Sequence, residues 1–321
     1  MRPLSICVLG GTGFIGSNLV SRLARDGHRV RVLTRNRDRH RELLVLPGLE
    51  LQDFDVHDGA MLPEALRGQD VVINLIGILN EAGRGAGFRR VHAELARKVV
   101  GACRSAGVPR LLHMSSLRAD EAAPSQYLRT KGLAERCVRE EAGPVAWTIF
   151  RPSVVFGPGD GFMNRFAGLL RLFPLLPIAR PRARFAPVYI GDVVEALVRS
   201  IDDRATHGAT LELCGPEVLT LAELVRYVAT VLGRRRLVVG LPDAAGWLQA
   251  LVMGFVPGKP LSLDNFRSLK LDSVCSENGL ARLGIQPASL RAIVPTYFGS
   301  AQRAAQLDAF RRATPGRDPG A

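Results

Sequence analysis

Long hydrophobic runs are absent from the sequence: none reaches the roughly 18 consecutive apolar residues that suggest a membrane-spanning helix. Secretory-signal features are also missing, because the strand-like segment LSICVLG (residues 4–10) begins within three residues of the start. We therefore expect an intracellular, cytoplasmic protein. Its 321 residues, 47% of them hydrophobic, are enough for one large core or two small ones.

Cysteine is scarce and irregularly spaced. The five cysteines lie at positions 7, 103, 137, 214 and 275, and no two form a CxxC pair or a metal-binding knuckle. This odd number with wide spacing predicts free, mostly buried thiols in a reducing compartment. We therefore expect no metal site.

Lysine is also scarce, at positions 98, 131, 259 and 270 alone, so arginine supplies nearly all of the formal net charge of +13. Such an excess favours an anionic partner: a phosphorylated cofactor, an anionic membrane surface or nucleic acid. Arginines spread over solvated faces are the alternative. We expect no nucleic-acid partner, because the sequence has no aromatic platform interleaved with basic residues and no helix-turn-helix or zinc pattern.

The first half of the sequence alternates between segments typical of strands and of helices. Buried-strand patterns begin at residues 4, 28, 49, 70, 110 and 146, and helical patterns separate most of them. This order predicts an α/β fold, a doubly wound parallel sheet with crossover helices on both faces. We assign residues 1–155 to this domain.

After residue 155 the pattern changes. Residues 157–187 are rich in Pro, Gly and Arg and are expected to form loops and one helix that cap the sheet. Segments 187–202 and 209–233 each predict a strand and a helix, with Asp192 as a helix N-cap. We expect residues 156–300 to form a small lobe, partly interleaved with the sheet, for a substrate or partner. The tail, residues 301–321, is expected to be disordered.

Residues 244–271 are hydrophobic but interrupted by Gly and Pro, and they are too short to span a bilayer. Two interpretations remain for them. They form the core of the small lobe, or they form a surface that docks on a membrane or a partner protein.

Glycines mark the first strand-to-helix connection, where GGTGFIG lies between a predicted strand and a predicted helix. A bound dinucleotide needs a tight turn, close backbone approach and a helix amino terminus aimed at its phosphates. Glycine supplies the first two because it lacks a Cβ and tolerates positive φ. The spacing is GxxGxxG rather than GxGxxG, so the strand and helix context carries the argument. The residues predicted to bind the dinucleotide here are Gly10, Thr12, Gly13, Phe14, Ile15 and Gly16.

The ends of the second and third predicted strands discriminate between cofactors. NAD binding usually places Asp or Glu at the end of the second strand, but this sequence has Thr34 and Arg35 there, with Arg37 nearby. A guanidinium can pair with a 2′-phosphate, so the sequence favours NADP(H) over NAD(H). The alternative is that these arginines are only surface charge. Asp55 and Val56, after the third strand, are placed to meet the adenine.

Tyr127 and Lys131 lie four residues apart on a predicted helix, and therefore on one face. A nearby ammonium would lower the pKa of the phenol, which could then act as an acid or base on a substrate oxygen. The fifth strand ends in HMSS, so Ser116 is expected to hold that oxygen, with Ser115 as its competitor. His113 is expected to be a packed core residue, and His92 is assigned no role.

These motifs together resemble the short-chain dehydrogenase/reductase superfamily in its extended or atypical form, over about residues 4–215. They are the glycine turn, Asp55–Val56, NLIG (74–77), SS (115–116), YLRTK (127–131) and RPSVVFGPGD (151–160). Within it, VVINLIG, SQYLRTKGLAERCVRE, RPSVVFGPGDGFMNRFAGLLR and PVYIGDVVEAL are similar to the nucleotide-binding accessory subunit of respiratory complex I. The bacterial relatives of that subunit, which are NAD-dependent epimerase/dehydratase-like, share the similarity.

The resemblance implies a Rossmann fold with a small carboxyl-terminal lobe and a tightly held NADP(H). It further implies that Asn74 and Gly77 line the cofactor. Arg151, Pro152 and Ser153 would lie near the nicotinamide. By the same resemblance, contact with a respiratory complex or the inner face of a membrane is expected, and the cofactor could be structural.

Two features depart from the extended members of the superfamily. The loop between Ser116 and Tyr127 has only ten residues, and the fourth strand carries NLIG instead of a more Ala-rich sequence. The short loop makes a large sugar nucleotide a less natural substrate. Two hypotheses follow. The first is an NADP(H)-dependent oxidoreductase acting on a carbonyl or alcohol, or an epimerase or dehydratase variant of it. The second is a non-catalytic accessory protein of a respiratory NADH:quinone oxidoreductase.

Overall fold

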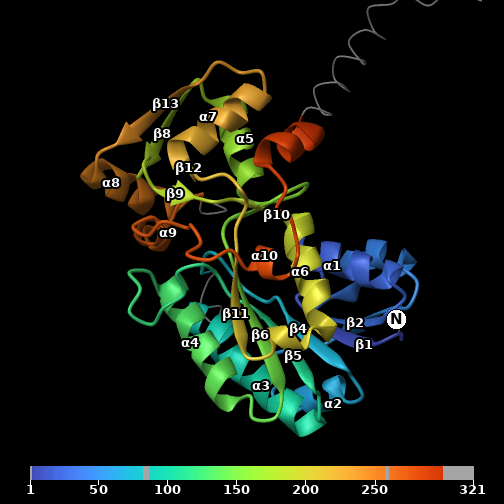
Figure 1. Ribbon diagram of the computed structural model, residues 1–321. Coiled ribbons are helices and arrows are strands. Elements are labelled where there is room, and N and C mark those ends of the chain that lie inside the picture. The colour runs from blue at the N-terminus through green and yellow to red at the C-terminus, as the bar shows by residue number, and fades with distance from the viewer. Residues whose placement is uncertain (1, 82–86, 257–259, 299–321) are drawn as a thin grey trace, which may run out of the picture.

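The computed structural model describes residues 2–81, 87–256 and 260–298. Figure 1 shows a twisted sheet with helices on both faces and, above it, a smaller lobe of short strands and helices. Among the described residues, no helix has both the length and the apolar character needed to cross a bilayer. The predicted tail, residues 301–321, lies outside the described residues.

Seven strands form the central sheet, and every neighbouring pair is parallel. They are β1 (Ser5–Leu9), β2 (Arg29–Thr34), β3 (Leu49–Asp53), β4 (Val71–Asn74), β5 (Arg110–Met114), β6 (Ala146–Pro152) and β11 (Ala209–Leu213). Their order is β11-β6-β5-β4-β1-β2-β3, so the strand order reverses between β1 and β4. Ligands of open α/β sheets bind at the carboxyl ends of the strands beside such a reversal. The predicted fold class is confirmed.

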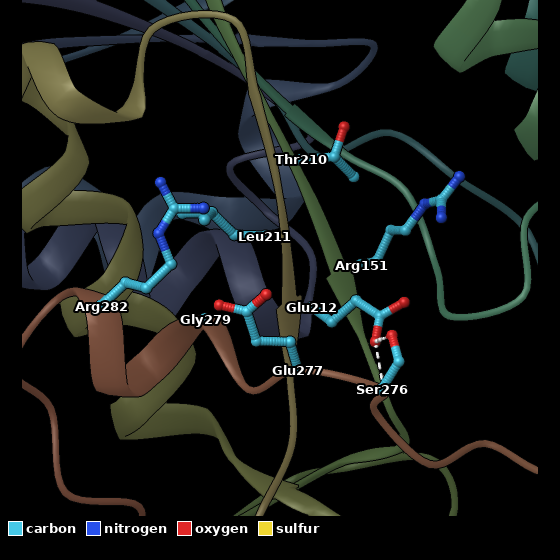
Figure 2. A pocket seen from close by; sticks show the side chains of 8 residues that line it. All are labelled: Arg151, Thr210, Leu211, Glu212, Ser276, Glu277, Gly279 and Arg282. Carbon is cyan, nitrogen blue, oxygen red and sulfur yellow. Dashed lines mark hydrogen bonds between the residues drawn. The ribbon is translucent and has the colours of Figure 1, made fainter.

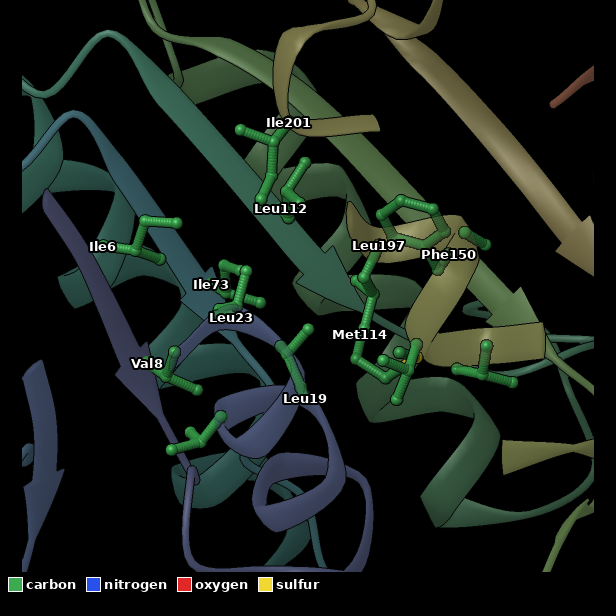
Figure 3. Close-up of a cluster of buried hydrophobic side chains, with 14 of the residues drawn as sticks. Ile6, Val8, Leu19, Leu23, Ile73, Leu112, Met114, Phe150, Leu197 and Ile201 are labelled. Carbon is green, nitrogen blue, oxygen red and sulfur yellow. The ribbon is translucent and has the colours of Figure 1, made fainter. Parts of the chain in front are cut away.

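Helices cover both faces of the sheet. One face carries α1 (Phe14–Arg25) and α6 (Ile190–Asp202), and the other carries α2 (Leu62–Leu66), α3 (Leu95–Ala106) and α4 (Gln126–Glu141). Successive β1 side chains alternate between the two cores: Ile6 and Val8 pack with α1 and α6, and Cys7 and Leu9 pack with α2 and α3. Figure 3 shows the first of these cores. Strands buried on both faces read as continuous apolar runs, which is why their positions were visible in the sequence.

The lobe and connections hold the remaining elements. The central part of the chain has two 3₁₀ segments, η1 (Arg37–Val45) and η3 (Arg204–Thr206), and a π-helical segment, η2 (Arg89–Glu94). The short strands are β7 (Val155–Phe156), β8 (Leu175–Ala179), β9 (Arg184–Phe185), β10 (Val188–Tyr189), β12 (Leu219–Thr220) and β13 (Leu237–Leu241). The helices are α5 (Met163–Leu172), α7 (Leu221–Val231), α8 (Asp243–Met253), α9 (Leu263–Ser268) and α10 (Gly279–Arg282), and residues 290–298 are also helical.

The lobe corrects two expectations. Residues 157–187 are more than loops and one helix, because β8 and β9 pair with β13 and β12 from later in the chain, a pairing that local composition does not encode. Asp192 is not the N-cap of α6: Tyr189 occupies that position, and the Asp192 carboxylate accepts a hydrogen bond from Ala288 N. The division of the chain near residue 155 stays a prediction.

Residues 244–271 contribute to the lobe core only in part. Within them, α8 buries Gly246 and Ala250, and α9 buries Phe266. Large side chains of α8, including Trp247, are exposed.

Candidate functional site

The glycine turn joins β1 to α1 at the point where the strand order reverses. Gly10 has φ of 80°, and a Cβ there would lie 3.2 Å from Ile76 N. A Cβ on Gly16 would lie 2.2 Å from Gly10 O and 2.6 Å from Gly11 Cα. Only glycine therefore allows the helix to begin so close to the turn.

The amino terminus of α1 has the character of an anion site. Gly13 is the N-cap of α1. Within the described residues, no side chain caps this helix end and no acidic residue lies in its first turn. Thr12, Phe14 and Ile15 are half-buried around this end. The unpaired N–H groups and the helix dipole thus face outward, as a pyrophosphate requires.

The ends of β2 and β3 present basic and acidic groups beside the turn. Thr34 is buried and Arg35 is exposed, and no ion pair to Arg35 is formed within the described part of the chain. Arg37 is less free, because its backbone N–H donates to Asp53 Oδ1 at 2.8 Å and its guanidinium lies 3.8 Å from Asp53 Oδ2. After β3, Asp55 is exposed and accepts a hydrogen bond from the following turn.

Two buried polar side chains, Asn74 and His113, lie at the carboxyl ends of β4 and β5. Asn74 Nδ2 lies 3.3 Å from His113 Nδ1, and Asn74 Oδ1 accepts a hydrogen bond from Ile76 N at 3.2 Å. Burial, with the charge of Lys131, lowers the pKa of His113 to about 3, so this histidine is neutral. It is buried in the sheet, as expected from the sequence. Asn74 is thereby fixed in the loop that leads to Gly77.

Lys131 is buried beneath the site. Its Nζ donates to Met114 O at 3.0 Å, at the end of β5. Burial lowers the pKa of the ammonium to about 8, and the carboxylate of Glu135 opposes the shift. A Cβ on Gly77 would lie 3.1 Å from Lys131 Nζ and 3.6 Å from His92 Nε2, so a larger residue there would crowd the lysine.

Tyr127 lies one turn before Lys131 on α4. Burial raises the pKa of the phenol above its ordinary value, and the neighbouring Ser116 hydroxyl opposes the shift. The Ser116 Oγ nonetheless makes no hydrogen bond of normal geometry within the described residues, and neither does Ser115 Oγ. The expected lowering of the phenol pKa is wrong: burial raises this pKa, and the Lys131 Nζ donates to Met114 O.

The fit of these residues to a nicotinamide dinucleotide rests on two observations. The absence of a Cβ at Gly16 lets the start of α1 lie against the backbone of the glycine turn, which brings the helix amino terminus to the place where a pyrophosphate would bind. The Ser116 hydroxyl is buried without a partner at the carboxyl end of β5. A buried hydroxyl is costly unless something accepts or donates a hydrogen bond, so the residues present fit a ligand at this place.

His92 belongs to this site, although the sequence analysis assigned no role to it. Its Nε2 accepts a hydrogen bond from Ile78 N at 3.1 Å, so Nδ1 carries the proton and donates to Thr130 Oγ1 at 2.9 Å. Burial lowers the pKa of His92 to about 2. The ring meets Tyr127 edge-on, with centroids 5.5 Å apart. His92 lies in the π-helical segment η2, and such irregular turns are frequent at functional sites.

Asp264 of the lobe also reaches the site. Its carboxylate accepts hydrogen bonds from Gln126 N at 2.7 Å and Tyr127 N at 3.0 Å, at the amino terminus of α4. Ser268, from the same short helix, donates to the N-cap Ser125 at 2.8 Å. The sequence did not reveal this cap, because Asp264 is 137 residues from Tyr127 and no local pattern connects it to α4.

The residues after β6 are held by protein partners. Arg151 donates to Glu135 at 2.7 and 2.6 Å and to Ala119 O at 3.2 Å. Ser153 Oγ donates to Ser273 O at 2.7 Å, and Pro152 is buried. These contacts join β6 to α4 and to the lobe, and a place beside the nicotinamide stays a prediction.

A cavity of about 180 Å³ lies beside β11 rather than beside Tyr127. Figure 2 shows the Glu212 carboxylate, which accepts hydrogen bonds from Ser276, with Arg151 and Arg282 on either side. Two arginines and two glutamates line it, and of the predicted site residues in the described part of the chain only Arg151 is among its lining. It is lined by Arg151, Thr210, Leu211, Glu212, Ser276, Glu277, Gly279 and Arg282.

The cysteines correct another expectation. Cys214, after β11, forms a disulfide with Cys275 in the lobe segment that follows α9. Cys7, Cys103 and Cys137 are free and buried, as expected. The pair was missed because its members are 61 residues apart and only the fold brings them together. Among the described residues, no group of side chains is arranged to hold a metal ion.

Similarity to known proteins agrees with this geometry. Residues 10–160 match a family model described as NAD(P)H-binding. The chain is 32% identical over 293 residues to mitochondrial NADH dehydrogenase (ubiquinone) 1 alpha subcomplex subunit 9 of Mus musculus, covering 88% of this chain and 76% of the relative. It is 33% identical over 241 residues to ceramide reductase of Caulobacter vibrioides, covering 74% of each.

Solved structures show the same fold. MoeE5 in complex with UDP-glucose and NAD aligns with a TM-score of 0.73 at 20% identity, over 94% of this chain and 99% of that one. The glycine turn, the strand order and the family model thus define a class, the NAD(P)-binding proteins with a Rossmann fold. The chain belongs to the short-chain dehydrogenase/reductase superfamily, in the group that includes the complex I subunit and the ceramide reductase.

Proposed function

We propose that the protein is an NADP(H)-dependent oxidoreductase that reduces a carbonyl compound or oxidises the corresponding alcohol. The observation that carries this proposal is the meeting of three groups at the carboxyl edge of the sheet. They are the Tyr127 phenol, the unpartnered Ser116 hydroxyl and the buried Lys131 ammonium. All three lie across the strand reversal from the glycine turn, where a dinucleotide would bring its nicotinamide.

The cofactor would be held by the chain's own backbone and charges. The amides at the start of α1 would bind the pyrophosphate, and Arg35 would pair with the 2′-phosphate. Asp55 and Val56 would meet the adenine, and Asn74 and Gly77 would line the ring end. When bound, the dinucleotide would supply the hydride chemistry.

The residues around the substrate oxygen would manage its proton. Because burial raises the pKa of Tyr127, the phenol is protonated at neutral pH and suited to donate a proton to an oxygen that gains negative charge. Ser116 would donate a hydrogen bond to the same oxygen. This protonation state favours carbonyl reduction as the working direction. An epimerase or dehydratase would use the same groups.

A non-catalytic accessory protein of a respiratory NADH:quinone oxidoreductase is the second candidate. The similarity to the 1 alpha subcomplex subunit 9 proteins supports it. In that case the dinucleotide would be a structural ligand, and the protein would lie at the inner face of a membrane. A cytoplasmic location suits both candidates.

Replacement of Tyr127 by Phe tests the catalytic proposal. Ligand-stripped protein is loaded with NADPH and offered aldehydes and ketones, including ketones of membrane lipids because one relative is named a ceramide reductase. We expect Tyr127→Phe to lower kcat by about 100-fold or more while NADPH still binds. Tyr227→Phe is the matched control, since that phenol lies in α7 and has no hydrogen-bond partner in the described residues.

Two results separate the candidates. Turnover that survives Tyr127→Phe would contradict the acid role. Wild-type protein that retains bound NADPH without exchange and oxidises it on no carbonyl compound would favour the accessory function.

A further inference from the structure

The outer face of the β8–β13 pair is apolar, and α8 covers only the end of it at Ala179. In this two-stranded sheet the inward side chains, Leu176 and Val238 among them, are buried in the lobe core. The outward side chains Leu175, Leu237 and Val239 are exposed, with Leu237 at 60%. A soluble sheet usually turns polar side chains to water on its open face, so this pattern indicates a contact.

The same surface continues onto α5 and α8. Figure 1 shows α8 beside the β8–β13 pair at the outer end of the lobe. Gln249 of α8 donates to Pro177 O of β8 at 2.8 Å, which fixes the helix against the strands. We call the outward residues of this region the lobe-end surface. It comprises Leu172, Phe173, Leu175, Leu237, Val239, Trp247, Leu248, Val252, Phe255 and Val256.

Arginines border this surface. An open groove of about 760 Å³ brings Pro174 and Leu237 together with Arg226, Arg234 and Arg235. The three guanidinium groups are on exposed residues and form no salt bridge within the described part of the chain, and no acidic residue lines the groove. At this groove the surface combines apolar side chains with charge of one sign, and it is therefore complementary to something both apolar and anionic.

We propose that the lobe-end surface rests on an anionic lipid bilayer. Trp247, Phe255 and the aliphatic side chains would enter the interface between headgroups and acyl chains, and the arginines would pair with lipid phosphates. A second copy of the chain is a poor occupant, because a symmetric contact would place the arginines of both copies in one interface and the groove offers no acidic residue to pair with them. The proposal does not depend on turnover, since it concerns a surface outside the nucleotide site.

The lobe-end surface is connected to the proposed reaction groups through α8 and α9. Gly246 of α8 approaches Phe266 of α9, with 3.1 Å between its ideal Cβ and that ring, and Asp264 of α9 binds the backbone of Tyr127. A bilayer under α8 would therefore lie one helix away from the proposed reaction groups.

Co-sedimentation with vesicles tests the proposal on the full chain. The probes are vesicles of phosphatidylcholine alone and of phosphatidylcholine with a large fraction of phosphatidylglycerol. We expect strong binding to the anionic vesicles and weak binding to the neutral ones. Because each basic residue near an anionic surface contributes about a fivefold gain in affinity, Arg234→Glu with Arg235→Glu should weaken binding by about 25-fold or more.

Apolar and basic control variants distinguish binding through the lobe-end surface from attraction due to the overall charge of the protein. Trp247→Glu with Phe255→Glu should also abolish most binding. The matched changes Val45→Glu and Arg204→Glu, on exposed residues away from the lobe, should have little effect. Thermal unfolding and NADPH binding should be unchanged in all variants, which verifies that they fold.

Three outcomes would overturn the proposal. The first is an absence of binding to either vesicle. The second is equal loss in the lobe-end variants and their controls. The third is a dimer in sedimentation velocity that only the lobe-end variants dissociate, which would assign the surface to a second copy.

Discussion

The Asp264 carboxylate of α9 accepts a hydrogen bond from the backbone N–H of Tyr127, with 3.0 Å between Oδ2 and N. The same carboxylate caps Gln126 N at 2.7 Å. A negative charge at a helix amino terminus satisfies otherwise unpaired N–H groups and interacts favourably with the helix dipole. The lobe therefore fixes the start of the helix that carries the proposed acid.

Replacement of Asp264 by Ala should destabilise the protein and loosen Tyr127. We expect the free energy of unfolding to fall by about 1 kcal/mol, the usual value of a helix cap. Because the helix start moves, kcat should fall more than KM rises. Urea denaturation and steady-state kinetics measure the two effects, and Asp243→Ala, which removes an exposed carboxylate paired with Arg180, is the control. Unchanged stability and kcat would show that the cap has no influence on the site.

Gly16→Ala should abolish dinucleotide binding. Its Cβ would lie 2.2 Å from Gly10 O, so the turn must move away from the start of α1. Gly101→Ala, inside α3 with no atom within 4 Å of the new Cβ, should bind the cofactor normally and should be as stable as wild type or up to about 1 kcal/mol more stable. Cofactor fluorescence and thermal unfolding distinguish loss of binding from loss of fold. Normal binding by Gly16→Ala would contradict the assigned turn.

Lys131 should make stability rise with pH in the alkaline range. Its pKa is about 8 in the folded protein against 10.5 for the unperturbed side chain, so the unfolded state binds more protons between these values. The burial penalty is thus fully present below about pH 8 and is relieved as the pH rises toward 10.5. This pKa shift corresponds to a change of about 3 kcal/mol at most in the free energy of unfolding.

Comparison with Lys131→Met isolates this contribution from other titrating groups. We expect the variant to be more stable than wild type at pH 7 and the difference to shrink by pH 10, as measured by urea denaturation. A difference that is independent of pH would mean that the lysine is not buried in its charged form.

Thiol titration tests the disulfide between Cys214 and Cys275. Denatured, unreduced protein should react with a thiol reagent at three cysteines, namely Cys7, Cys103 and Cys137, and reduced protein at all five. Purification under thiol-blocking conditions preserves the state in the cell. Five reactive thiols without reduction would show that the pair is open.

The sheet and the glycine turn were predictable because their signals are local. The apolar runs at β1, β4 and β5 give the strands, and GGTGFIG between a strand and a helix gives the turn. Most of what the sequence did not reveal about the fold concerns long-range pairing. The disulfide, β8 with β13, and the cap by Asp264 each join segments more than 50 residues apart.

The chemistry of the site was harder to predict from the sequence than its location. The Tyr127 and Lys131 spacing placed both residues near the edge of the sheet, but it could not tell which atom the ammonium meets. That atom is Met114 O, and burial therefore decides the pKa of the phenol. His92 escaped notice because a histidine at the start of a helical pattern has no distinctive neighbour in sequence. The assigned site residues remain predictions until a ligand is bound.

Calorimetric titration of ligand-stripped protein with NADPH and NADH tests the central claim most directly. The account predicts saturable binding of NADPH at one site per chain. Arg35→Ala should weaken NADPH by about tenfold or more while NADH changes little, since only NADPH carries the 2′-phosphate. Arg41→Ala, whose guanidinium pairs with Asp38, should match wild type. Binding of neither dinucleotide would contradict the account, and equal losses for both in Arg35→Ala would refute the phosphate contact.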